Sequence, residues 1–198
     1  HNGKPMTTLE IANRIGKNPL AFTPGEKWQY GFSADILGAV IEVVSGMRLG
    51  EFLEKRLFEP LGMKDTGFFV PEDKRHRMAK VYRGTDAGLK EEITENLGIS
   101  HNREMPPAFE AGGAGLTSTI NDYSKFTQML LNKGELNGTR IMSESTVEFM
   151  TNSHITKAQE KGTREWESLA GYTYGNLMRI MKYPEYSAGL CSAGEYGW

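Results

Sequence analysis

The sequence predicts an α+β fold that is mainly helical and carries a few strands near its carboxyl end. Residues 34–45 place apolar side chains at the 3.6-residue period of a helix, and residues 121–132 do the same. Residues 172–182 alternate loosely between apolar and polar side chains, which is typical of a strand. Helical segments therefore dominate most of the chain, and the clearest strand signal comes after them.

Capping signals mark where the first helices begin and end. Thr7 and Glu10 have the spacing of a capping box, so a helix should begin near Thr7. Gly46 is expected to end the helix over residues 34–45. Another helix is expected over residues 49–58, and residues 60–62 (Pro-Leu-Gly) should end it.

The later part of the chain is less regular. Residues 71–110 are polar and interrupted by Gly and Pro, which predicts a long excursion with short strands. Residues 112–115 form a glycine-rich turn, for which a permissive backbone is the simplest interpretation. Ser143 should cap a short helix that ends near Met150, and a second strand is possible over residues 186–191.

Composition narrows the classes of function. The chain of 198 residues is 38% hydrophobic and 24% charged, with a formal net charge of −2. No basic excess points to nucleic acid, and the longest apolar stretch, residues 36–44, is too short to span a bilayer. The single Cys191 excludes an internal disulfide, and the histidines lack the spacing of metal ligands. No metal or cofactor is expected, and nothing in the chain assigns a localisation.

Five short motifs follow one another along the chain. Residues 22–42 hold a Pro-Gly turn, then Tyr-Gly-Phe, then a helix. Residues 58–66 carry PLGMKDT, and residues 111–119 carry AGGAGLTST. Residues 171–176 read GYTYGN, and residues 194–198 read GEYGW. Together these stretches resemble the superfamily of class C β-lactamases, carboxylesterases and D-stereospecific peptidases.

The resemblance implies a β-lactamase-like fold, in which a helical domain is inserted into an antiparallel sheet domain. Residues 1–170 would hold most of the helical domain, and residues 171–198 would hold strands of an incomplete sheet. Open strand edges recruit partners, so a homo-oligomer is a possible consequence.

The family's defining element is Ser-x-x-Lys, whose three-residue spacing sets a lysine amine beside the nucleophilic serine hydroxyl. No Ser or Thr of this chain is followed by Lys three residues later. The resemblance therefore implies an internal piece of a serine hydrolase that acts on small esters or amides through an acyl-enzyme. This piece alone should be inactive.

The resemblance also implies three site residues. Tyr30 occupies the tyrosine of the family's Tyr-x-Asn element and would be the catalytic base, although packing between the turn and the helix is the alternative. Phe32 replaces the asparagine that binds the amide of a lactam substrate, which favours esters unless Phe32 lies in the core. Trp198 would be the first residue of the third catalytic element and would contact substrate.

Two other classes of function stay open. A non-catalytic homologue could keep the cleft as a binding module without the nucleophile. A purely structural helical domain would have no site at all, and a pocket lined by Tyr30 and Trp198 would count against it.

Overall fold

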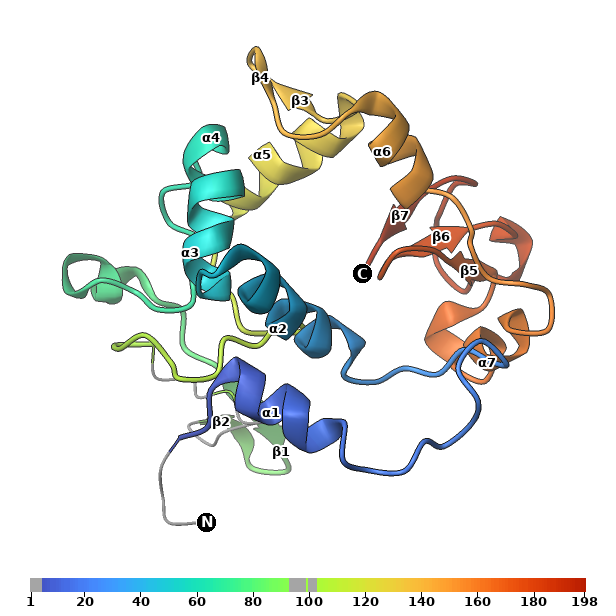
Figure 1. The fold of residues 1–198 in the computed structure, drawn as a ribbon, viewed down its shortest axis with the longest axis horizontal. Helices are drawn as coiled ribbons and strands as arrows, with labels where there is room; N and C mark the ends of the chain where they lie inside the picture. The colour runs from blue at the N-terminus through green and yellow to red at the C-terminus, as the bar shows by residue number, and fades with distance from the viewer. Residues whose placement is uncertain (1–4, 93–98, 100–102) are drawn as a thin grey trace. The chain divides into compact units, whose positions relative to one another are not determined.

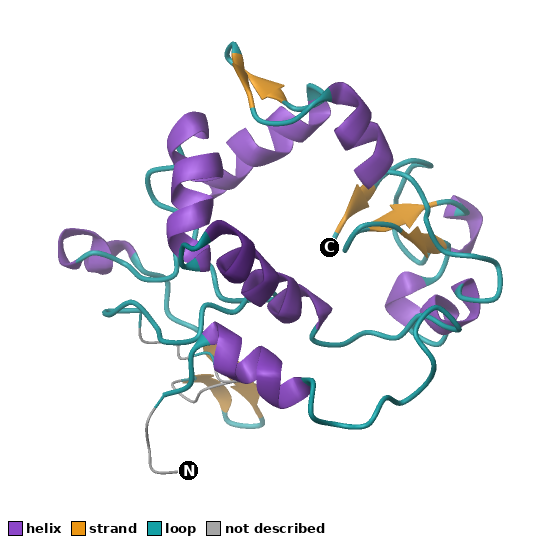
Figure 2. Ribbon diagram, in the orientation of Figure 1, coloured by secondary structure: helices purple, strands orange, loops and turns teal. Residues whose placement is uncertain are grey.

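A computed structural model describes residues 5–92, 99 and 103–198 of the chain (Figure 1). The described residues are mainly helical, with small antiparallel sheets, as the sequence predicts (Figure 2). The α-helices are α1 Thr8–Ile15, α2 Ser33–Ser45, α3 Leu49–Leu53, α4 Glu59–Leu61, α5 Ile120–Leu131, α6 Glu144–Met150 and α7 Glu160–Arg164. The strands are β1 Tyr82–Thr85, β2 Gly88–Glu91, β3 Glu135–Leu136, β4 Thr139–Arg140, β5 Tyr172–Tyr174, β6 Arg179–Met181 and β7 Tyr196–Gly197. None of the helices in the described ranges has the length and apolar character needed to cross a membrane.

The chain forms two compact units, each built from two stretches of sequence. The first unit contains residues 1–17 and 32–127, and the second contains residues 18–31 and 128–198. The expected boundary between residues 170 and 171, where a helical domain would meet strands of a sheet domain, stays a prediction.

The first unit begins with the predicted capping box. The Thr7 hydroxyl accepts a hydrogen bond from the Glu10 amide, and the Glu10 carboxylate accepts one from the Thr7 amide. Thr8 is buried, and its hydroxyl accepts a hydrogen bond from the Glu110 amide at 3.0 Å. The helix start is therefore fixed locally by its own cap and at long range by the chain that precedes the glycine-rich turn.

Helix α2 ends at Gly46 as predicted, since Gly46 is left-handed with a φ of 69°. Its apolar stripe, however, is largely exposed: Val40 is 49% accessible, Val43 63% and Val44 82%. The buried face carries small residues, among them Gly38, where an added Cβ would lie 2.9 Å from Leu49. Close approach of α3 thus selects the face that α2 buries, and the apolar period alone does not.

The helix expected over residues 49–58 continues to Leu61. It passes from α3 through a π-helical turn, Glu54–Phe58, into α4. A proline in a helix clashes with the carbonyl four residues earlier. The wider turn accommodates Pro60, because the Glu59 amide donates to the Glu54 carbonyl five residues back. Gly62, with a φ of 65°, then ends the helix.

The excursion over residues 71–110 has short strands, as predicted. A 3₁₀ helix, Glu72–Arg77, precedes the antiparallel hairpin of β1 and β2. The following glycine-rich turn reaches α2: a Cβ on Gly112 would overlap the carbonyl oxygen of Ala34, and the Gly113 amide donates to Asp35 at 3.2 Å. Neither glycine has a positive φ. Close packing therefore explains these glycines, and a permissive backbone does not.

Asp122 links the start of α5 to the PLGMKDT segment. Its buried carboxylate accepts hydrogen bonds from the Asp65 amide at 2.6 Å and from the Thr66 hydroxyl at 3.2 Å. The Lys125 ammonium donates to it at 3.0 Å and also to the carbonyl of Gly62. An anion in the first turn of a helix also interacts favourably with the helix dipole.

Asp122→Ala should lower the free energy of unfolding by about 1–3 kcal/mol, because the part-buried amide of Asp65 loses its acceptor. Asp122→Asn should cost less, since the amide oxygen can still accept from Asp65. Urea unfolding of the 198-residue chain measures both, with Asp73→Ala at an exposed acidic position as the control. An Asp122→Ala variant as stable as the control would contradict this role.

The second unit contains a three-stranded antiparallel sheet in the order β5–β6–β7. Figure 1 shows α7 beside β5, and these two elements are in contact. The core is made by buried side chains of α5, α6, the sheet and the segment before it, namely Met129, Leu130, Val147, Leu169, Ile180 and Met181. Ser143 caps α6 as predicted, because its hydroxyl accepts from the Thr146 amide.

Two strand predictions in this unit are wrong. Residues 172–182 form a hairpin of β5 and β6, because the chain reverses at Leu177, which has a φ of 59°. Residues 186–191 form no strand; a 3₁₀ helix, Pro184–Tyr186, and irregular chain occupy that place. The third strand of the sheet is β7, which pairs with β6 through Ile180 and Tyr196.

Candidate functional site

The segment that carries Tyr30 begins with a tight turn. Gly25 has a φ of 91°, which is the left-handed conformation that glycine adopts without strain. The Glu26 amide donates to the Thr23 carbonyl at 3.1 Å, and the Thr23 amide donates to the Glu26 carboxylate at 3.2 Å. The turn predicted over residues 22–25 is therefore present, and it is followed by residues 27–30 without regular secondary structure.

Helix α7 fixes the backbone of this segment. The side-chain amide of Gln159 donates to the carbonyl of Gly25 at 2.6 Å. Gly162 lies so close to Trp28 that an added Cβ would overlap the Trp28 carbonyl oxygen and lie 3.0 Å from its carbon. Only glycine allows this approach of two backbones. Because Tyr30 follows Trp28 by two residues, α7 sets the position from which Tyr30 projects.

Glu160 joins α7 to the sheet. Its carboxylate is 5% exposed and accepts hydrogen bonds from the Lys182 ammonium at 2.8 Å and from the Thr173 hydroxyl at 3.3 Å. The hydrogen bond from Lys182 holds the pKa of Glu160 below its usual range, against the opposing effect of burial. The charge is thus paired and hydrogen-bonded, which is the condition for burying it.

Glu160→Gln should lower the free energy of unfolding at pH 7 by about 1.5–3 kcal/mol, the usual value of a hydrogen bond to a charged group. A carboxyl whose pKa is lower in the folded state stabilises the fold above the unfolded-state pKa, and this stability is lost as pH falls through the folded-state pKa. Denaturation at pH 7 and again well below pH 4.5, the ordinary glutamate value, should show the difference shrinking in acid.

The exposed Glu165, next to α7, provides the matched control for this pH series. Glu165→Gln should leave stability nearly unchanged at both pH values. A loss in the Glu160→Gln variant that stays constant with pH would instead assign Glu160 a packing role.

Tyr30 and Trp198 meet in the second unit. Their ring centroids are 5.3 Å apart, and the ring planes differ by 14°, so the rings are stacked. Tyr30 is 46% exposed and Trp198 is 52% exposed. Trp198 directly follows β7, whose pairing with β6 places it there. Residues far apart in the sequence thus form one exposed aromatic surface, and Tyr30 is not a core residue.

Three further aromatic residues were not predicted as members of this site. Trp166 lies 4.9 Å from Tyr30, Tyr174 lies 5.7 Å from Trp198, and Trp28 contacts Trp166 and Tyr174 at 6.3 and 5.1 Å between ring centroids. We call these five residues (Trp28, Tyr30, Trp166, Tyr174 and Trp198) the aromatic cluster. One sequence signal was available: the cluster contains all three tryptophans of the chain.

The two tyrosines of the aromatic cluster differ in their surroundings. Burial raises the pKa of Tyr174, and the neighbouring Tyr30 raises it further. Tyr174 therefore stays protonated at neutral pH and can only donate or accept a hydrogen bond as a neutral phenol. Tyr30 is the more exposed of the two and is the one that solvent or a ligand reaches.

Phe32 belongs to the first unit and immediately precedes α2. It is 48% exposed, so the alternative that it is a core aromatic is wrong. Its side chain provides no cap for α2, because a phenyl ring cannot accept a hydrogen bond from the helix amides.

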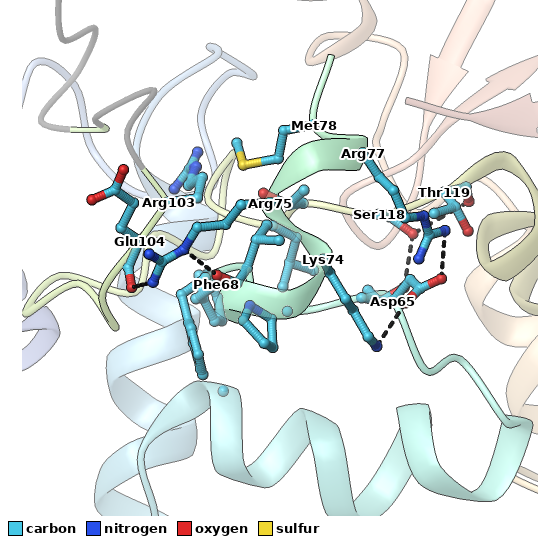
Figure 3. Close-up of a pocket in the computed structure, with 18 of the residues that line it drawn as sticks. Asp65, Phe68, Lys74, Arg75, Arg77, Met78, Arg103, Glu104, Ser118 and Thr119 are labelled. Carbon is cyan, nitrogen blue, oxygen red and sulfur yellow. Dashed lines mark hydrogen bonds and ion pairs between the residues drawn. The ribbon is translucent and has the colours of Figure 1, made fainter. Parts of the chain in front are cut away.

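The first unit also contains a cavity of about 1000 Å³ between α3 and the residues that follow α4. Figure 3 shows that the 3₁₀ helix Glu72–Arg77, Arg103 and Glu104 contribute to its wall. Phe68 and Met78 add apolar surface. None of the three predicted site residues lines this cavity.

Charged groups hold the cavity wall together. Asp65 binds Arg77 at 2.8 Å and Lys74 at 2.7 Å, and these two cations lower the pKa of Asp65 to about 2. The Arg75 guanidinium donates to the carbonyls of Val70 and Glu104, at 3.3 and 2.7 Å (Figure 3). These contacts explain the shape of the wall, and they do not bring a nucleophile and a base together.

Comparison with known proteins agrees with the motifs. The family model described as Beta-lactamase matches residues 2–176. The lovastatin esterase of Penicillium rubens is 32% identical over 195 residues, which cover 98% of this chain and 45% of that protein. The chain spans less than half the length of the curated relatives that it matches.

Solved structures share the fold. EstCE1, a hydrolase with promiscuous acyltransferase activity, matches with a TM-score of 0.75 at 21% identity and covers 96% of this chain and 50% of that chain. The octameric penicillin-binding protein homologue from Pyrococcus abyssi matches with a TM-score of 0.65 at 26% identity, over 90% of this chain and 35% of that one. These likenesses confirm the predicted β-lactamase-like fold. Since the family model matches most of the chain, the chain belongs to the beta-lactamase family.

Proposed function

We propose that the full-length protein is a serine hydrolase that cleaves esters through an acyl-enzyme, with Tyr30 as the general base. The observation that carries this proposal is the stacking of Tyr30 on Trp198 at 5.3 Å. It unites the segment that resembles the Tyr-x-Asn element with the segment that resembles the third catalytic element. The name of the lovastatin esterase supports an ester as substrate.

The proposed chemistry divides the work between two parts of the protein. The serine and lysine of a Ser-x-x-Lys element would lie outside this chain, because none of its Ser or Thr residues has the required spacing. Tyr30 would take the proton of that serine as the hydroxyl oxygen attacks the ester carbonyl. A phenol is a weak base unless a nearby cation favours the phenolate, and the lysine would supply that cation. Tyr30 would return this proton to the alkoxide as the ester C–O bond breaks, so that the alcohol leaves, and water would then hydrolyse the acyl-enzyme to the acid.

Hydrolysis of p-nitrophenyl acetate tests the proposal. The full-length protein should release p-nitrophenol with turnover, and the 198-residue chain should not. If the full-length protein leaves the ester intact but still binds it, the alternative of a non-catalytic binding homologue applies. The observation that favours this alternative is the missing Ser-x-x-Lys spacing in the chain.

Phe32 should bias the full-length protein toward esters over β-lactams. An asparagine can donate to and accept from the amide of a lactam substrate, whereas Phe32 leaves that amide unpaired. An unsatisfied buried polar group costs about 1–3 kcal/mol, or roughly ten- to a hundredfold in relative rate if it acts in the transition state. Phe32→Asn should therefore move the ratio of kcat/KM for a cephalosporin over a short-chain aryl ester upward by about this factor.

The exposed Phe149 of α6 provides a control for the Phe32 substitution. Phe149→Asn should leave the ratio of the two rates unchanged. A folded Phe32→Asn variant with an unchanged ratio would show that Phe32 does not set substrate preference.

Self-association through open strand edges stays a prediction for this chain. The sheet leaves β5 and β7 as its edge strands. The octameric homologue shows that a related protein assembles.

A further inference from the structure

The contacts within the aromatic cluster form a closed circuit. Starting from Trp28, each ring contacts the next through Trp166, Tyr30, Trp198 and Tyr174, and Tyr174 returns to Trp28. The five centroid separations lie between 4.9 and 6.3 Å. This is the range in which aromatic pairs prefer offset stacking or edge-to-face packing.

The five rings of the circuit differ in their exposure to solvent. Trp28 and Tyr174 are half-buried, whereas Tyr30, Trp166 and Trp198 are 46%, 40% and 52% exposed. Large aromatic rings gathered at the surface mark a binding site more often than an ordinary surface. The contacts of α7 with β5 and with the Trp28 backbone hold the segments that carry these rings.

Trp166 extends this surface beyond the residues that resemble family motifs. Its backbone amide donates to the carbonyl of Thr163 at 3.2 Å, which holds it at the end of α7. Its ring is tilted by 50° to Tyr30, whereas Trp198 lies nearly parallel to Tyr30. Tyr30 therefore contacts two indole rings, those of Trp166 and Trp198, which differ in their orientation relative to the phenol. A planar ring docked against them would lie beside the phenol.

We propose that Trp166 is a specificity-determining residue, which together with Trp198 forms a subsite for a planar aromatic group in the acyl or alcohol part of the ester. This inference rests on the proposed esterase function. An aromatic ring can stack on the indoles and gain more than the apolar area that it buries, whereas a saturated ring of equal size gains area alone.

Matched pairs of esters test the subsite in the full-length protein. Methyl phenylacetate is compared with methyl cyclohexylacetate, and benzyl acetate with cyclohexylmethyl acetate, by proton release. In at least one pair the aromatic ester should have a kcat/KM about two- to tenfold higher. Trp166→Leu should reduce that ratio to about one, and Trp166→Phe should keep most of it, since a phenyl ring still stacks.

The exposed Tyr186 lies outside the aromatic cluster in the same unit, so Tyr186→Leu is the matched control and should keep the ratio. Equal rates for aromatic and saturated esters in both pairs would overturn the inference. A ratio that survives Trp166→Leu would overturn it as well.

A binding measurement separates this inference from the proposed function. Every tryptophan of the chain belongs to the aromatic cluster, so a docked ring should change the fluorescence that they emit. Phenylacetamide should bind more tightly than cyclohexylacetamide, and Trp166→Leu should abolish the difference. If no ester is hydrolysed but this difference is found, the function fails and the subsite stands. If Tyr30→Phe removes esterase turnover but both amides bind equally, the subsite fails and the function stands.

Discussion

Tyr30→Phe in the full-length protein should lower kcat for p-nitrophenyl acetate by about 10²–10⁴-fold, the usual worth of a positioned proton-transfer group. The substitution removes one oxygen and keeps the ring. The stacking on Trp198 at 5.3 Å and the contact with Trp166 at 4.9 Å should therefore persist. Little change in KM or in thermal stability is expected, because the phenol ring supplies the packing and the hydroxyl supplies the chemistry.

Tyr186→Phe provides the control for this substitution, because Tyr186 is an exposed tyrosine of the same unit that contacts Tyr183 rather than the aromatic cluster. It should leave kcat unchanged. Near-normal turnover in a folded Tyr30→Phe variant would return Tyr30 to a packing role within the aromatic cluster.

Gly162→Ala should have the second-largest effect, although alanine is the better helix former by about 1 kcal/mol. A Cβ at Gly162 would overlap the carbonyl oxygen of Trp28, and neither backbone can yield without opening the contact of α7 with that segment. Overpacking of this kind costs about 1–3 kcal/mol and more where backbone must move, so a loss above about 3 kcal/mol is expected.

The same substitution should also reduce turnover. Tyr30 follows Trp28 by two residues, and a shift of about 1 Å in a catalytic group can cost about a hundredfold in rate. Chemical unfolding and p-nitrophenyl acetate turnover measure the two effects. Gly189→Ala, at a position in the same unit where an added Cβ would meet nothing closer than 4.0 Å, should show neither. A Gly162→Ala variant with the stability and turnover of this control would contradict the role assigned to α7.

Helix ends were the part of the fold that the sequence predicted best, because their signals are local. The capping box at Thr7, the left-handed Gly46 and the cap at Ser143 each act within one turn of chain. The missed hairpin of β5 and β6 also has a local signal: its turn, closed by the hydrogen bond from the Gly175 amide to the Met178 carbonyl, contains the turn-forming pair Gly175-Asn176. The prediction for α2 failed because a distant contact decides the structure, since α2 buries the small-residue face that α3 can approach.

The candidate site also contains residues that the sequence predicted and residues that it did not. Tyr30 and Trp198 were predicted from resemblance to motifs, and their stacking could not be read from their separation in the chain. Trp28, Trp166 and Tyr174 join them only because Glu160 and Gly162 fix α7 against the sheet and against the Trp28 segment. No local sequence pattern predicts these long-range contacts. The one available signal is the rarity of tryptophan, since all three tryptophans of the chain belong to the aromatic cluster.

Intact-mass spectrometry after treatment with a fluorophosphonate tests the central claim, that this chain is part of a serine hydrolase whose nucleophile lies elsewhere in the full-length protein. The full-length protein should gain one phosphonyl group per molecule, on the serine of a Ser-x-x-Lys element. The 198-residue chain should gain none, because none of its serines or threonines has a lysine three residues later. A stoichiometric adduct on the 198-residue chain, or no adduct on the folded full-length protein, would contradict the account.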